Sequence, residues 1–366
     1  MSETKAEICL PTTDLRQDIP FFTKDLRMKM DMIYPADDPR VAVFSGHGIR
    51  VRLDQDIQSA AGALRILTEN PRDFAQTQSL TAPGGTRVEI HPLNPPLVIP
   101  EVEHAFVVRR LADQAPWVIG RAGMQYRDLV PSRLGGAMIA SHIRIAEAGP
   151  VGDMVHFHKV GFQLIFCVNG WVDVVYEDQG EPIRLTRGAC FIQPPEIRHR
   201  VLFSGDDLEV LEIGVPAEHV TQIDHTLALP NGKGAPGREW DGQRFVHNDP
   251  AGATYTRFRL PGFEARDTTI AANTGNVAGV MVYRPDGSGA FDWVRHDAGI
   301  HFSFVMAGEM VLEGEGKAPF RLSRGDAFVT PPNMATRVRA PSDDLEVIEV
   351  TLPGAFASTL GEKKPG

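Results

Sequence analysis

The residues most able to do chemistry lie in the stretch HFHKVGFQLIFCVNG, which covers residues 156–170. His156 and His158 are two positions apart, and Gln163 follows five residues after the second histidine. Because side chains alternate between the two faces of a β-strand, His156 and His158 point to the same side. Two imidazoles at this spacing can share one metal ion, and Gln163 can add an oxygen ligand from the adjoining strand or turn.

A third imidazole is available from a separate segment, QPPEIRH, which ends at His199. The proline pair places the following strand at a sheet edge. Three imidazoles and one oxygen donor suit Fe, Mn, Ni, Cu or Zn. The alternative is a group of satisfied core histidines. We favour the metal site, because histidines are rarely buried in threes without a ligand or a charge.

Gln163 stands where a carboxylate ligand would be more usual. A glutamate would bring a negative charge and a built-in base, whereas the amide oxygen of Gln163 is neutral. A divalent ion then keeps its full positive charge and is a stronger Lewis acid. The weak amide ligand also leaves coordination positions open for a bidentate substrate.

The two segments resemble the two motifs of the cupin superfamily, G-x5-H-x-H-x3–4-E-x6-G and G-x5-P-x-G-x2-H-x3-N. HFHKVGFQLIFCVNG matches the first, with Gln163 at the glutamate position, and GACFIQPPEIRH matches the second. In the second motif, Glu196 and Phe203 replace a glycine and the asparagine. The resemblance covers residues 100–355 or so and identifies the chain as a bicupin.

The resemblance implies two chemistries. Three-histidine iron cupins chelate an oxygenated substrate and O2 and cleave a C–C bond, whereas other cupins with three histidines and a glutamine are isomerases, cyclases or lyases. We expect one divalent transition metal, with Fe(II) favoured and Zn, Mn or Ni as alternatives. The leading hypothesis is a dioxygenase acting on a small, carboxylate-bearing hydroxy or keto compound. A Lewis-acid enzyme and a non-catalytic small-molecule-binding protein are the alternatives.

His142 and Arg144 in ASHIRI share one strand face. If that face lines the barrel, Arg144 could pair with a substrate carboxylate and His142 could act as general base. If it points outward, both are surface residues. The pleat alone does not decide between the two faces.

An internal repeat indicates how these segments are positioned. GACFIQPPEIRHRVLFSGDDLEVLEI recurs 137 residues later as GDAFVTPPNMATRVRAPSDDLEVIEV, and FCVNG recurs as FVMAG. Short alternating runs between glycines and prolines are typical of antiparallel strands with tight turns. We predict a mainly β fold with two tandem cupin (double-stranded β-helix) barrels, 96–228 and 229–366, joined near LPNGKGAPG.

The second copy of the site is altered. Aligning the closing glycines places Val294, His296, His301 and Thr336 where the first copy has its two histidines, glutamine and final histidine. Two ligands would hold a metal weakly. We therefore predict a degenerate, mostly structural second barrel, with a remodelled weak site as the alternative.

Residues 1–95 read as a small α+β domain, strand–helix–strands, that resembles the vicinal-oxygen-chelate (glyoxalase and bleomycin-resistance) family. The resemblance places Glu7 and Glu89 at ligand positions, but Arg52 occupies a third and cannot bind a cation. We expect a metal-free domain that serves packing, dimerisation or substrate shielding.

The composition narrows the function classes. A chain of 366 residues, 42% hydrophobic and 23% charged, is typical of a globular protein with two or three domains. A net charge of −10 without a basic block disfavours nucleic acid, and no apolar run is long enough for a membrane span. Three scattered cysteines and a polar start predict a cytoplasmic protein. The truncated front domain predicts exposed sheet and a homo-oligomer, a dimer.

Overall fold

The computed structural model describes residues 4–35, 38–113, 117–120, 123–235 and 237–361. The chain divides into two compact units, 1–96 and 97–366. Strands far outnumber helices, which confirms the mainly β prediction. Within the described residues, no helix has the length and apolar character needed to cross a membrane.

The first unit follows the predicted order of strand, helix and strands. Its helix begins where Asp14 accepts a hydrogen bond from the backbone N–H of Arg16. The four-stranded sheet has the order β1-β4-β3-β2, and a three-stranded sheet has the order β5-β7-β6. The elements are β1 (Ile8–Pro11), α1 (Leu15–Pro20), the π-helical turn η1 (Phe21–Asp25), β2 (Lys29–Tyr34), β3 (Val41–Gly46), β4 (Ile49–Asp54), β5 (Ala63–Thr68), α2 (Pro71–Phe74), β6 (Ser79–Thr81) and β7 (Arg87–Pro92).

The carboxylates singled out in this unit lie in ion pairs. Arg50 Nε donates to Glu7 Oε1 at 2.7 Å, and Glu89 lies 3.3 Å from the guanidinium of Arg87. Arg52 pairs with Asp54 at 2.9 Å. The resemblance to the vicinal-oxygen-chelate family stays a prediction.

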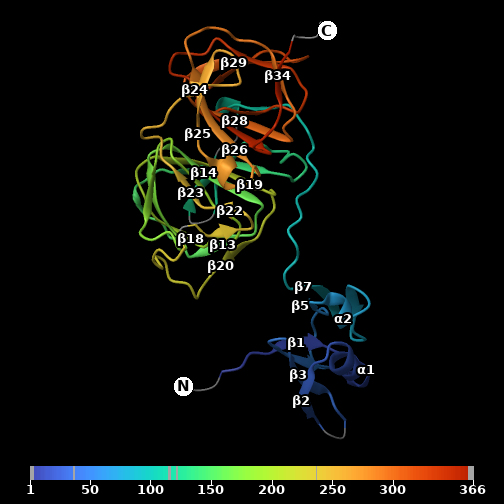
Figure 1. Cartoon of the computed structure of the whole chain (residues 1–366). Coiled ribbons are helices and arrows are strands. Elements are labelled where there is room, and N and C mark those ends of the chain that lie inside the picture. The colour runs from blue at the N-terminus through green and yellow to red at the C-terminus, as the bar shows by residue number, and fades with distance from the viewer. Residues whose placement is uncertain (1–3, 36–37, 114–116, 121–122, 236, 362–366) are drawn as a thin grey trace. The chain divides into compact units, whose positions relative to one another are not determined.

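The second unit contains two barrels, each built from two antiparallel sheets. In Figure 1 the first barrel is mainly green and yellow and the second mainly orange and red. The first has the sheets β23-β17-β14-β19-β11-β10-β9 and β16-β15-β18-β13-β20. Their bounds are β9 (Val118–Ile119), β10 (Gln125–Asp128), β11 (Ile139–Ile145), β13 (His156–His158), β14 (Phe162–Asn169), β15 (Trp171–Tyr176), β16 (Ile183–Thr186), β17 (Cys190–Ile192), β18 (His199–Ser204), β19 (Leu208–Val215), β20 (Thr221–Ile223) and β23 (Val246–Asn248).

The second barrel repeats this plan with the sheets β24-β25-β26-β33-β28-β31-β8 and β30-β29-β32-β27-β34. Their bounds are β8 (Val107–Arg109), β24 (Thr256–Arg257), β25 (Phe263–Asp267), β26 (Gly279–Pro285), β27 (Val294–His296), β28 (Ile300–Ala307), β29 (Glu309–Gly314), β30 (Phe320–Ser323), β31 (Ala327–Val329), β32 (Thr336–Arg339), β33 (Glu346–Leu352) and β34 (Ser358–Leu360).

The repeat is visible in the strand register. The β14–β19 ladder shifts register after Cys167, and the β28–β33 ladder shifts after Val305, the equivalent residue. Each long strand then turns at a glycine with φ of 70°, Gly170 or Gly308. A Cβ at Gly308 would lie 2.6 Å from the backbone of Leu345, and one at Gly170 would be crowded by the backbone of Leu208 at 3.1 Å. With the positive φ, this crowding favours glycine in both copies.

The two barrels pack through their seven-stranded sheets. Leu164 and Phe166 on β14 and Phe302 and Phe304 on β28 belong to one buried apolar cluster. The alternate residues of β14, such as Ile165, face the interior of the first barrel. Both faces of these sheets are therefore buried.

Each barrel also takes one strand from the other barrel's segment of sequence. β8, which precedes the first barrel along the chain, pairs with β31 of the second. β23, which follows the linker, pairs with β17 of the first. The predicted boundaries at 96 and 229 assign β8 and β23 to the opposite barrels, and the structure corrects this assignment.

Candidate metal centre

Three histidines meet in the first barrel. His156 and His158 lie on β13, and His199 begins β18, where it stands directly opposite His156 in the antiparallel ladder. The ring centroids are 4.3 Å apart for His156 and His199, 5.1 Å for His156 and His158, and 5.2 Å for His158 and His199. All three are buried, and their nitrogen ligand atoms lie within 4.8 Å of one another. The predicted three residues are thus brought together.

Hydrogen bonds to backbone carbonyls fix which nitrogen can bind an ion in two of the three rings. His156 Nδ1 lies 2.7 Å from the carbonyl of Met154, and His199 Nδ1 lies 3.0 Å from the carbonyl of Ile197. A carbonyl can only accept, so each Nδ1 carries the hydrogen and each Nε2 keeps its lone pair. His158 is held by Thr221, whose hydroxyl lies 2.9 Å from Nδ1. Metal-bound histidines are oriented in this way, so the donor set fits a divalent transition metal.

A carboxylate that the sequence analysis missed lies in the same cavity. Glu212 on β19 lines the cavity together with His158 and His199. Gln163, buried on β14, donates from Nε2 to Glu212 Oε1 at 2.6 Å. The predicted role of Gln163 as a fourth ligand stays a prediction; its amide orients Glu212.

The repeat held a signal for this carboxylate. DLEVLEI and DLEVIEV both keep a glutamate at the equivalent position, Glu212 in the first barrel and Glu349 in the second. In the second barrel Glu349 contacts His301, the equivalent of Gln163. In both barrels this glutamate therefore contacts the residue at the equivalent position of the long strand, Gln163 on β14 or His301 on β28.

The cavity beside the histidines has a volume of about 620 Å3, part of which is open to solvent. Aliphatic side chains from both sheets make up most of its wall, among them Ile143, Ile165, Val174 and Val210. No Lys or Arg is among the described residues that line it. The cavity therefore suits an uncharged, largely apolar molecule.

His142 and Arg144 share a strand face as predicted, but that face points away from the cavity. Ile143 and Ile145, their neighbours on β11, are the residues that line it. Arg144 instead pairs with Asp207 at 2.9 Å near the surface. The prediction that these two residues act on a substrate in the barrel is therefore wrong in its geometry.

His142 contributes to the contact between the barrels. Its Nδ1 accepts from Arg127 at 2.6 Å, so Nε2 carries the hydrogen and donates to Glu209 at 3.0 Å. Its ring lies edge-on against Phe304 of the second barrel, with centroids 5.2 Å apart. Burial lowers the pKa of His142 although Glu209 opposes this shift, so the ring is neutral near pH 7.

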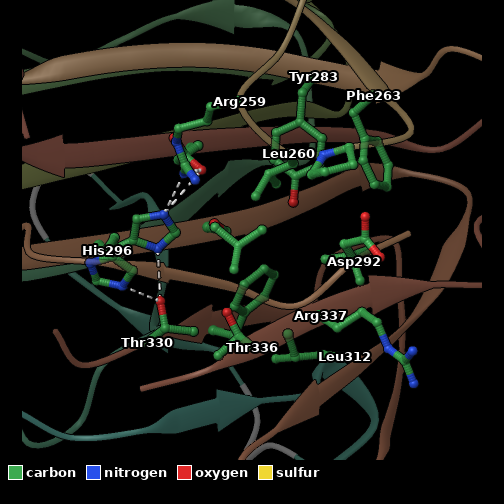
Figure 2. A pocket seen from close by; sticks show the side chains of 17 residues that line it. Arg259, Leu260, Phe263, Tyr283, Asp292, His296, Leu312, Thr330, Thr336 and Arg337 are labelled. Atoms are coloured by element: carbon green, nitrogen blue, oxygen red, sulfur yellow. Dashed lines mark hydrogen bonds and ion pairs between the residues drawn. The ribbon is translucent and has the colours of Figure 1, made fainter. Parts of the chain in front are cut away.

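The equivalent residues of the second barrel line the pocket shown in Figure 2. The rings of His296 and His301 are stacked with centroids 4.3 Å apart, and the hydroxyl of Thr330 lies 3.0 Å and 2.9 Å from their nitrogens. Arg259 donates to His301 at 2.8 Å and pairs with Glu349. A guanidinium thus supplies positive charge beside the two remaining histidines.

Burial and charge set the ionisation of this cluster. Burial, together with the electrostatic effects of His301 and the Arg259 guanidinium, lowers the pKa of His296 to about 3. Burial would raise the pKa of Glu349, but Arg259 and His301 outweigh it and hold this pKa at about 2. At neutral pH His296 is therefore uncharged, while Glu349 is ionised.

The buried state of His296 should make the protein sensitive to acid. Its pKa is about 3 in the folded protein and about 6.5 when unfolded, so the unfolded chain binds the extra proton between these values. The free energy of unfolding should therefore decrease as the pH is lowered through this window, by at most about 1.4 kcal/mol per pH unit from this group. We expect His296→Asn to flatten the dependence in urea unfolding between about pH 4 and 7. His225→Asn, at an exposed histidine, is the control and should leave the slope unchanged.

Comparison with known proteins supports the cupin resemblance. The cupin domain model matches residues 279–351, within the second barrel. Salicylate 1,2-dioxygenase from Pseudaminobacter salicylatoxidans is similar with a TM-score of 0.52 and 15% identity, over 72% of this chain and 90% of that chain. Bacillus subtilis oxalate decarboxylase, described with Mn(II) centres, has a TM-score of 0.52 and 13% identity, over 71% and 81%. No curated protein sequence matches the chain. These likenesses confirm the predicted architecture of cupin barrels.

Proposed function

We propose that the first barrel holds one divalent metal ion on His156, His158 and His199 and that the protein is a dioxygenase for a small oxygenated organic compound. The observation that carries this proposal is the meeting of three buried imidazoles from two strands, two of which, His158 and His199, line a cavity. Similar structures include a dioxygenase and a decarboxylase with Mn(II) centres, which supports a metal-dependent enzyme. Fe(II) is the metal we favour, and Zn, Mn or Ni also suit the donor set.

The residues of the site have separate roles in this proposal. A bound Fe(II) ion would supply positions for chelation of substrate oxygens and activation of O2. The free oxygen of Glu212 can accept the proton that a substrate hydroxyl loses, while Gln163 holds the other oxygen. The aliphatic wall offers few polar groups to hold water beside the substrate. Because Arg144 lies elsewhere and no other described Lys or Arg lines the cavity, we no longer expect a substrate carboxylate that is held away from the metal.

A non-redox isomerase, cyclase or lyase is the second candidate, and Glu212 is the observation that favours it. Proton transfer needs a base beside the polarised oxygen, and Glu212 lines the cavity with two of the three histidines. The neutral amide of Gln163 would leave the ion's charge undiminished. Both candidates use the same metal centre.

Oxygen consumption distinguishes the two candidates. The protein is loaded anaerobically with one equivalent of Fe(II) or Zn(II) and assayed with a panel of hydroxy ketones and diketones. For a dioxygenase we expect turnover only with Fe(II), one O2 consumed per product formed, and no turnover under argon. Equal turnover under argon or with Zn(II) would contradict the dioxygenase and support the Lewis-acid enzyme.

A further inference from the structure

Two polar side chains in the cavity wall have hydrogen-bonding capacity that the described protein does not use. Gln193 follows β17 and Tyr176 ends β15, and their side chains are 4% and 1% exposed. Gln193 Nε2 donates to the Tyr176 hydroxyl at 2.9 Å. The other amide atom, Gln193 Oε1, is buried and has no hydrogen-bond partner among the described residues.

The shared hydrogen bond determines what the two groups offer to a ligand. The Tyr176 oxygen accepts a hydrogen bond from Gln193, so the hydroxyl hydrogen is left to donate to a different acceptor. No described residue provides that acceptor. A phenol has an ordinary pKa of about 10, so the hydroxyl keeps that hydrogen at neutral pH. The pair thus presents one donor and one acceptor side by side. Buried polar atoms are normally satisfied, which points to a partner from outside the chain.

The pair lies next to the metal centre. Tyr176 is opposite His199 in the β15–β18 ladder, and their ring centroids are 5.6 Å apart. Gln193 donates from its backbone N–H to the carbonyl of Gln163 at 3.0 Å. Both side chains line the cavity that also contains Glu212.

The second barrel shows that this pair accompanies the three-histidine site. The repeat places Thr330 at the position of Gln193 and Gly314 at the position of Tyr176. Figure 2 shows the hydroxyl of Thr330 satisfied between two imidazoles. Where the triad is lost, the phenol and the amide are also lost. A barrel of this kind therefore folds without the tyrosine and the glutamine at these two positions.

We propose that Tyr176 and Gln193 bind one hydroxyl group of an uncharged substrate, separate from the oxygens that chelate the metal. The Tyr176 O–H donates to the oxygen of this hydroxyl, and Gln193 Oε1 accepts its hydrogen. This proposal rests on the proposed metal site and adds the substrate class to it: an uncharged compound with a chelating oxygen pair and a further hydroxyl beside it. A site built around a hydroxyl rejects the analogue that lacks it, because buried polar groups are then left without partners.

Three rigid probes separate the chelating pair from the further hydroxyl. Catechol has the chelating pair alone, pyrogallol adds a neighbouring hydroxyl, and 3-methoxycatechol replaces that hydroxyl with a methoxy group, which cannot donate. Their affinities are measured by calorimetry under argon on Zn(II)-loaded protein, so that no turnover is needed. We expect pyrogallol to bind about 10- to 100-fold more tightly than catechol, and 3-methoxycatechol no more tightly than catechol.

Variants then assign the preference to the pair. Tyr176→Phe and Gln193→Leu should each reduce the preference for pyrogallol to less than about threefold, with one Zn(II) still bound per chain. Tyr283→Phe, at a buried tyrosine of the second barrel's pocket, is the matched control and should keep the full preference. Equal affinity for the three probes with Zn(II) bound, or variants that retain the preference, would overturn the proposed role of Tyr176 and Gln193 and leave the metal site standing. A protein that takes up no metal would overturn the proposed function and this inference together.

Discussion

His199→Ala is expected to abolish metal binding in the first barrel and, with it, turnover. His199 is the ligand that comes from a separate strand, and without it His156 and His158 would hold an ion from one side only. Loss of an outer partner of a metal ligand typically weakens binding about 10- to 100-fold, so loss of a ligand should exceed about 100-fold. Elemental analysis after dialysis should find one ion per wild-type chain and none in the variant.

A nearby histidine provides a sharp control for this result. The ring of His219 lies 5.5 Å from that of His158, but it does not belong to the cluster of three. Its Nδ1 is 2.9 Å from the carbonyl of Pro216. His219→Ala should keep one ion per chain. If His199→Ala also kept a full equivalent with unchanged affinity, the three imidazoles would not be the metal site.

Arg259→Ala is expected to cause the largest loss of stability, although it lies in the barrel without the triad. Glu349 is almost fully buried, Arg259 is the cation paired with it, and His301 lies beside both. Removing one partner of a buried ion pair typically costs about 3–5 kcal/mol, because the other charge is left buried without compensation. In a unit of this size the melting temperature should fall by about 10 °C, measured by calorimetry. The metal content of the first barrel should not change.

Two further variants test the cause of this loss. Arg337 lines the same pocket but pairs with Glu313 nearer the surface, so Arg337→Ala should cost less than about 1 kcal/mol. Adding Glu349→Gln to Arg259→Ala should recover part of the stability, because the buried charge is then removed. A loss equal to that of Arg337→Ala, or no recovery in the double variant, would show that the pair is not a buried ion pair in the folded protein.

The sequence predicted the three histidines because their signal is local. The spacing of His156 and His158 fixes a shared face, and the second motif brings His199 to the neighbouring strand. Glu212 has no such local spacing, although the repeat keeps a glutamate at its position. It enters the cavity only because the β14–β19 register places it opposite Ile165, and register between distant strands is not visible in a spacing.

The inner face of β11 could not be predicted from the sequence for a related reason. Strands usually show their inner face by alternation of apolar and polar residues, but both faces of this sheet are buried. Ile143 lines the cavity, while His142 on the other face packs between the barrels. Polar residues in such a strand can therefore serve either face, and ASHIRI contains no residue that decides between them.

The exchange of β8 and β23 has a consequence for how the chain can be divided. A fragment that ends at the linker would keep β8 but lack β31, the strand with which β8 pairs. It would also lack β23, so the edge of β17 would be uncovered. The complementary fragment would have the opposite defect at β31. The two halves therefore cannot be exchanged as independent modules, and a chain nicked in the linker would stay held together by its own reciprocal edge strands.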